Sequence, residues 1–146
     1  MFNTILVAVD GSLAGKRALD AAIDLAKCSN ASLRLLHVIA DLPLPQEIVE
    51  MIASGEITES RSEILRTSAE LILQNAKRRC EKADYTNVTT DYVTGDPARK
   101  ILEYADRHNA DLIVIGHRGL DSQSDMLGSV ARKLINMTQR SCLIVG

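Results

Sequence analysis

Aromatic residues are scarce in this 146-residue sequence, which has one Phe, three Tyr and no Trp. Proteins that bind single-stranded RNA or DNA stack the bases on aromatic side chains, and the sequence offers little for such contacts. The formal net charge is −2, and the basic residues are spread along the chain, so no basic patch is expected for a phosphate backbone. Both features argue against a nucleic-acid-binding protein.

Cysteines are also few, and none is placed like a metal ligand. Cys28, Cys80 and Cys142 are far apart and form no CxxC motif, which is typical of core or near-surface residues in a reducing compartment. No apolar run approaches the about 20 residues that span a bilayer, and the N-terminus lacks a basic region followed by a long apolar stretch. We expect a cytoplasmic protein, not inserted in a membrane, with one domain over residues 1–146.

Apolar runs alternate with amphipathic stretches along the chain. Runs rich in β-branched residues predict buried parallel strands, and apolar residues spaced by three and four predict helices that cover a sheet. The predicted strands are 4–9, 31–38, 87–93, 112–115 and 142–145, and the predicted helices are 12–28, 59–83, 97–108 and 129–138. The alternation predicts an α/β fold, a three-layer α/β/α sandwich with a five-stranded parallel sheet.

Residues 40–60 are the least regular part of the sequence, with two prolines and a glycine among mixed residues. We expect a long loop there, with a short helix at 46–53. Long insertions of this kind often form lids or partner surfaces. A variable connector without a function is an equally good interpretation of this segment.

The segment Asp111–Lys133 has the features of a phosphate-binding loop. Gly116 and Gly119 allow a ligand to approach the backbone closely. Gly128 and Ser129 stand where a helix begins, so that free N–H groups, the helix dipole and a hydroxyl would converge on an anion. An ordinary connection with turn glycines and a Ser N-cap is the alternative, but a loop of about a dozen residues favours a ligand.

The spacing Gly-x2-Gly-x8-Gly-Ser fits neither the dinucleotide fingerprint nor the Walker loop. The segments IGHRG and LGSVARKL resemble the ATP-binding loop of the universal stress protein family, which has the spacing Gly-x2-Gly-x9-Gly-Ser/Thr. The loop of this sequence is one residue shorter. The resemblance extends from ILVAVDGS through LLHV and GDPARKIL to the end of the chain. It implies the strand order 3-2-1-4-5 of Rossmann-like, nucleotide alpha-hydrolase-like folds. It also implies a homodimer that pairs through the C-terminal strand Cys142–Val145.

The resemblance implies that the ligand is an adenine nucleotide, ATP or AMP/ADP, bound where the winding of the sheet reverses, beyond strands one and four. Asp10 matches an aspartate that contacts the ribose or its metal, so an indirect role with Mg²⁺ is expected. The alternative is that Asp10 forms a turn or caps a helix. This structural role is compatible with a contact to the nucleotide. The positions that form the adenine pocket in this family correspond to Ala8, Val38 and Ile115 here. The candidate binding residues are Ala8, Asp10, Val38, Ile115, Gly116, Arg118, Gly119, Gly128, Ser129 and Val130.

The expected function is a stress-response or regulatory module that binds ATP or a related nucleotide, acting through a protein partner or transporter. No nucleophile–base pair, carboxylate dyad or metal cluster has a spacing that demands catalysis. A slow nucleotidase, with Asp10 as the one candidate base, is the enzyme alternative. A nucleotide-free interaction protein is another, because Asp121 and Asp125 of the shortened loop would repel a polyphosphate. Arg118 and Lys133 are the cations expected near the phosphates.

Asp121→Asn combined with Asp125→Asn is expected to tighten ATP binding more than AMP binding. Exposed, screened charges interact by about 1 kcal/mol or less, which corresponds to at most about a tenfold change in affinity. Calorimetric titration of both nucleotides, with and without Mg²⁺, measures the effect. Equal ATP affinities for the wild type and the double variant would show that the two carboxylates lie away from the ligand.

Overall fold

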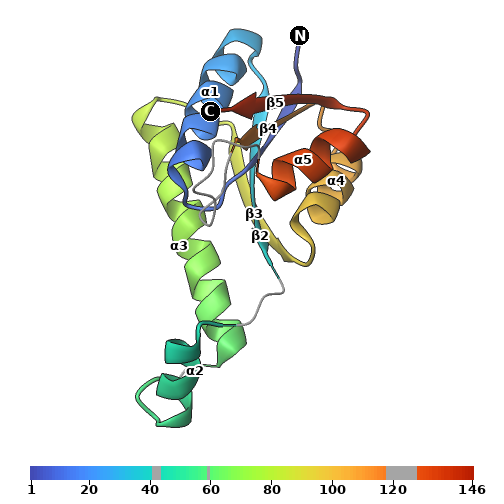
Figure 1. Ribbon diagram of the computed structural model, residues 1–146. Helices are drawn as coiled ribbons and strands as arrows, with labels where there is room; N and C mark the ends of the chain where they lie inside the picture. The colour runs from blue at the N-terminus through green and yellow to red at the C-terminus, as the bar shows by residue number, and fades with distance from the viewer. Residues whose placement is uncertain (41–43, 59, 118–127) are drawn as a thin grey trace.

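The computed structural model describes residues 1–40, 44–58, 60–117 and 128–146. These residues form a parallel sheet with the strand order β3-β2-β1-β4-β5 (Figure 1). The strands are β1 (Thr4–Ala8), β2 (Ser32–Ile39), β3 (Val88–Thr94), β4 (Leu112–Gly116) and β5 (Ser141–Val145). The helices are α1 (Leu13–Ser29), α2 (Gln46–Ala53), α3 (Arg61–Lys82), α4 (Pro97–Arg107) and α5 (Ser129–Met137). The predicted fold class and strand order are confirmed.

Helices cover both faces of the sheet, which makes the three layers seen in Figure 1. α1 and α3 pack on the face that receives Ile5 and Val7, whereas α4 and α5 pack on the face that receives Leu6. Successive side chains of a strand point to opposite faces, and all three of these residues are fully buried. β1 is therefore apolar on both sides, as a central strand of a parallel sheet must be.

Three helices begin where the sequence supplies a capping side chain. The side chains of Ser12, Ser60 and Asp96 each accept a hydrogen bond from the backbone N–H three residues later. These bonds satisfy donors that have no partner inside the helix. The observed ends differ from the predicted ones by at most two residues, and the predicted strand 142–145 begins one residue earlier, at Ser141.

The two outer strands differ in polarity. β3 has exposed residues such as Thr89 and Asp91, which confirms that this strand is the polar edge expected from its sequence. β5 forms the opposite edge. Its four residues from Cys142 to Val145 are half-buried and, except for the thiol, aliphatic.

The long helix α3 extends well beyond the sheet, and α2 lies at its outer end (Figure 1). The bounds of α2 match the short helix expected at 46–53. At the inner end of α3, the Arg79 guanidinium donates hydrogen bonds to both carboxylate oxygens of Asp20 on α1, at 2.6 and 2.8 Å, and this lowers the pKa of Asp20. Although α3 has 22 residues, neither it nor any other described helix is long and apolar enough to cross a membrane.

Candidate functional site

The turn after β1 contains the predicted site residue Asp10. Its Oδ1 atom accepts hydrogen bonds from the backbone N–H of Ser12 at 2.9 Å and from the Ser12 hydroxyl at 2.5 Å. The Ser12 oxygen in turn accepts a bond from the Gly15 N–H at 3.0 Å and caps α1. Gly11 has a φ of +83°, a left-handed conformation that favours glycine. The turn-forming role considered for Asp10 is therefore present in the structure.

The first turn of α1 packs against the end of β4. A Cβ atom added to Gly116 would lie 2.8 Å from the carbonyl carbon of Ala14 and 3.0 Å from its oxygen. A Cβ atom added to Gly15 would lie 2.8 Å from Asp10 Oδ1. The first turn of α1 thus contacts both the chain that follows β1 and the end of β4, which were expected to be neighbours. Gly116 is required for this contact between helix and strand, in addition to any approach by a ligand.

Four apolar site residues come together between the sheet and the α4–α5 layer. Ala8, Val38, Ile115 and Val130 come from β1, β2, β4 and α5, and all four belong to one apolar cluster. Ile115 is 7% exposed, whereas the other three are half-buried. The three strand residues stand at or near the carboxyl ends of their strands, which meet at one edge of a parallel sheet. This edge offers a partly open apolar surface.

The N-terminus of α5 stands beside the end of β4. The His117 N–H donates to the Val145 carbonyl at 2.6 Å, and the Gly128 N–H donates to the His117 carbonyl at 2.8 Å. Gly128 is the N-cap of α5, and no side chain caps this helix within the described residues. Ser129 is exposed and Val130 half-buried, so the N–H groups of the first turn begin next to the apolar cluster. Arg118, Gly119, Asp121 and Asp125 lie outside the residues that the structure describes.

Lys133 was expected to be a cation near the phosphates, but it contacts another partner in the structure. Its ammonium group lies 3.7 Å from a carboxylate oxygen of Asp96, the N-cap residue of α4. Both side chains are about half exposed, with relative accessibilities of 61% and 48%. Such a pair is weak, but it directs Lys133 toward α4.

His37 has a structural contact that the sequence did not reveal. Its Nδ1 atom lies 2.8 Å from the carbonyl oxygen of Val9. Because a carbonyl oxygen only accepts, Nδ1 carries a proton and donates this bond. The half-buried imidazole thus ties β2 to the chain immediately before Asp10. A histidine at the end of a strand, beside the candidate residue Val38, was the only sequence signal for it.

The cysteines give no sign of a reactive centre. Cys28, Cys80 and Cys142 are free thiols. Burial raises the pKa of Cys80 to about 11 and also raises the pKa of Cys142, so these thiols stay protonated at neutral pH. Among the described residues, no three His, Cys, Asp or Glu side chains are grouped so that they hold a metal ion.

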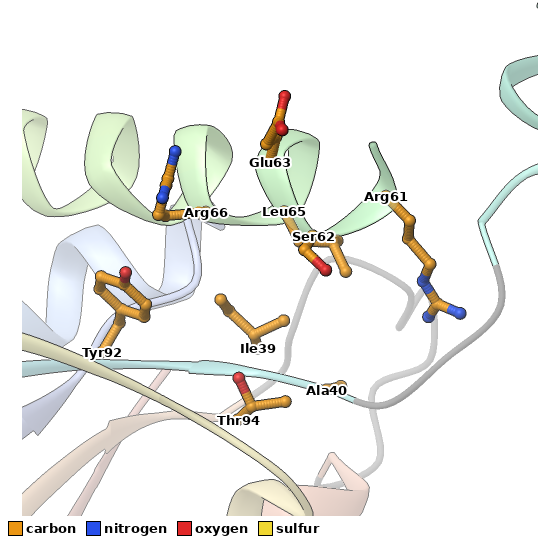
Figure 2. A pocket seen from close by; sticks show the side chains of 9 residues that line it. All are labelled: Ile39, Ala40, Arg61, Ser62, Glu63, Leu65, Arg66, Tyr92 and Thr94. Atoms are coloured by element: carbon orange, nitrogen blue, oxygen red, sulfur yellow. The ribbon is translucent and has the colours of Figure 1, made fainter. Parts of the chain in front are cut away.

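A cavity of about 500 Å³ lies on the other face of the sheet, between the first turns of α3 and the carboxyl ends of β2 and β3 (Figure 2). Ile39 and Leu65 are among its lining residues. Because Ile39 follows Val38 in β2, their side chains point to opposite faces. The cavity is therefore separate from the candidate site formed by Ala8, Val38, Ile115 and α5.

A parallel sheet of this strand order, with the start of a helix beside its carboxyl edge, defines a Rossmann-like protein. The family model described as the universal stress protein family matches residues 1–146. Universal stress protein YxiE of Bacillus subtilis is 36% identical over 149 residues, covering 99% of this chain and 99% of its own. The chain therefore belongs to the universal stress protein family.

Two solved structures are similar over nearly their whole length. Hypothetical protein MJ0577 matches with a TM-score of 0.77 and 26% identity, covering 99% of this chain and 96% of that one. A universal stress protein solved in complex with cAMP matches with a TM-score of 0.72 and 28% identity, covering 99% and 97%. Both similarities agree with the fold described above.

Gly116→Ala is expected to lower the free energy of unfolding by about 1–3 kcal/mol, the range typical of an inserted methyl group in a packed site. The new Cβ meets backbone atoms of Ala14, which move only if α1 shifts. Urea unfolding measures the change. Gly146→Ala is the control, since a Cβ there meets no atom within 4 Å. Equal stability of the Gly116→Ala and wild-type proteins would contradict the packing argument.

Proposed function

We propose that this protein binds an adenine nucleotide, ATP or AMP/ADP, at the carboxyl edge of the sheet and acts as a cytoplasmic stress-response or regulatory module. The purine would lie on the apolar surface formed by Ala8, Val38 and Ile115. The phosphates would lie at the N-terminus of α5, near Gly128, Ser129 and Val130. Arg118 and Gly119 are included in the proposed binding site because they belong to the sequence motif of the loop.

The observation that carries this proposal is the backbone of Val38. The Val9 N–H donates to the Leu36 carbonyl, whereas the Gly95 N–H donates to the Ile39 carbonyl. Backbone groups alternate in direction along a strand, so the N–H and C=O of Val38 point toward β1, as those of Leu36 do. β1 ends at Ala8, opposite Leu36. Within the described residues, therefore, no strand continues beside Val38 on that side.

An adjacent backbone donor and acceptor match the edge of an adenine ring, which carries an amino group next to a ring nitrogen. No distinctive side chain is needed for such recognition. The universal stress protein that was solved in complex with cAMP supports an adenine ligand for this family member. The apolar contacts from Ala8 and Ile115 add affinity without selecting among nucleotides that share the base.

The start of α5 supports the proposed phosphate position. α1, α3 and α4 have capping side chains, whereas α2 and α5 begin without one among the described residues, and of these two only α5 begins beside the carboxyl edge of β4. Free N–H groups and the positive end of the helix dipole bind anions. Gly116, where β4 ends, and Ser129 flank this position.

Mg²⁺ fits the proposed site as an ion bound mainly by phosphate oxygens. Asp10 uses Oδ1 for both bonds to Ser12, and Mg²⁺ at nucleotide sites is commonly held by one or two carboxylates, water and phosphates. Asp10 would then contact the ion indirectly, through water. The same bonds to Ser12 hold the carboxylate in the turn, so we propose binding without efficient turnover. A phosphate-release assay separates this proposal from a slow nucleotidase.

We also propose a homodimer through β5. This strand is a sheet edge whose backbone groups on the outer side have no strand partner among the described residues, and such an edge pairs readily with another chain. Antiparallel pairing of two β5 copies about a two-fold axis satisfies both edges at once. A protein partner or transporter that responds to the nucleotide would complete the regulatory role.

Val38→Pro is expected to weaken adenine nucleotide binding about fivefold or more, because it removes the N–H that points toward β1 and one hydrogen bond is worth about 1 kcal/mol or more. The N–H of Val38 does not face β3, so proline removes no bond to that strand. Calorimetric titration with ATP and AMP gives the affinities, and circular dichroism checks the fold. Val38→Ala is the matched control and should bind nearly as well as the wild type. Full affinity in a folded Val38→Pro protein would refute backbone recognition.

Leu143→Arg is expected to halve the mass of the assembly, because a charged side chain in β5 would be buried without a partner at a paired edge. Sedimentation velocity measures the mass. Leu71→Arg is the control, since Leu71 is 55% exposed on α3, and it should leave the mass unchanged. An unchanged mass for Leu143→Arg would rule out β5 as the interface.

A further inference from the structure

The carbonyl group of Val9 stands where the bonding between β1 and β2 would continue. Leu36 of β2 pairs with Ala8 of β1, and the Leu36 carbonyl accepts a hydrogen bond from the Val9 N–H at 2.9 Å. Bonds in a parallel ladder are evenly spaced, and a residue that faces the neighbouring strand bonds to the residues on both sides of its partner. The next bond in this series would therefore run from the Val38 N–H to the Val9 carbonyl.

In the structure, the Val9 carbonyl accepts a hydrogen bond from a different donor. The Nδ1 atom of His37 lies 2.8 Å from this carbonyl oxygen, and in the described part of the chain no backbone hydrogen bond joins the Val38 N–H to it. Val9 is only 6% exposed, so its carbonyl needs a partner within the protein. The imidazole supplies that partner, and the Val38 N–H stays available on the side of β1.

His37 reaches this carbonyl from the face of the sheet opposite the proposed purine position. The side chain of Val38 packs in the apolar cluster with α4 and α5, whereas Ile39 lines the cavity beside α3 (Figure 2). Because side chains alternate between the faces along a strand, His37 shares the α3 face with Ile39. The imidazole would therefore act on a nucleotide through the backbone and not by direct contact.

We propose that His37 is a positioning residue of the nucleotide site: its Nδ1–H group occupies the Val9 carbonyl and thereby keeps the Val38 N–H free for the adenine ring. This inference rests on the function proposed above and adds one residue to its site. The bond requires an imidazole that carries its proton on Nδ1. Because Val9 directly precedes Asp10, the same bond also fixes the start of the turn that carries the Asp10 carboxylate.

Removal of the imidazole donor is expected to close the backbone site. In the His37→Leu protein, the Val9 carbonyl would be buried without its partner, which is unfavourable. The Val38 N–H is the next donor of the ladder, and pairing with it satisfies both groups. The pairing of β1 with β2 would then extend by one bond, and a nucleotide would lose the N–H that recognises the ring nitrogen.

Hydrogen exchange of the nucleotide-free protein, measured by NMR, tests this rearrangement. The Val38 amide of His37→Leu is expected to exchange about tenfold more slowly than that of the wild type, or slower still, because a bonded amide exchanges only when the bond opens. His37→Asn is the matched control: its amide nitrogen takes the place of Nδ1, so exchange should be as fast as in the wild type. His37→Gln places its nitrogen nearer the position of Nε2 and should resemble His37→Leu, which it replaces if that variant does not fold. Equal exchange of the Val38 amide in the wild type and in the folded variant without the Nδ1 donor would overturn the proposal.

Calorimetric titration with AMP and ATP separates the role of His37 from the proposed function itself. His37→Leu is expected to bind both nucleotides about fivefold more weakly or more, the effect of one lost hydrogen bond, and by similar factors because both share the adenine ring. His37→Asn should restore the affinity, which a side chain that serves only packing would not do. Failure of the wild type to bind either nucleotide would refute the proposed function, while the exchange measurement still decides whether His37 frees the Val38 N–H. Wild-type affinity in a folded His37→Leu protein would overturn the role of His37.

Discussion

The candidate site depends on the early end of β1. This strand stops at Ala8, whereas β2 continues to Ile39 and pairs there with β3. The turn from Asp10 to Ser12 directs the chain into α1, and the capping bond of Ser12 contributes about 1 kcal/mol to that helix. Because α1 starts so soon, its first turn lies on the end of β4. Among the residues that the structure describes, the backbone of β2 beyond Leu36 faces no strand on the β1 side. The backbone recognition proposed for Val38 follows from this geometry.

The stability of the fold arises mainly away from that edge. Leu6, Leu36 and Ile113 are fully buried under α4 and α5, and burial of such a side chain contributes about 1.5–3 kcal/mol. The half-exposed ion pair between Arg79 and Asp20 contributes less than about 1 kcal/mol. The core therefore dominates, and the half-buried residues of the carboxyl edge are free to serve binding. Gly116 is an exception, because it both ends β4 and packs on α1.

Local signals predicted the elements of this fold because they agree with the packing. The apolar runs marked β1 and β4, and Asp96-Pro97 marked the start of α4. Strand order came from the family resemblance, since alternation alone does not show which strands pair. The contact of Gly116 with Ala14 and the bond from His37 to Val9 were not predictable, because each joins segments that only tertiary packing brings together. The sequence also did not predict that Lys133 contacts Asp96. The two residues are distant in sequence, and only tertiary packing brings them together.

The end of β2 connects the candidate nucleotide site to the cavity beside α3. Val38 directs its backbone toward β1 and its side chain to the α4–α5 face, whereas the next residue, Ile39, lines the cavity beside α3. A ligand that fixes the backbone at Val38 also fixes the side chain one position later. Nucleotide bound at Val38 would therefore also restrict this part of the cavity lining. Any molecule bound in the cavity would share with the nucleotide a coupling free energy that is equal in both directions.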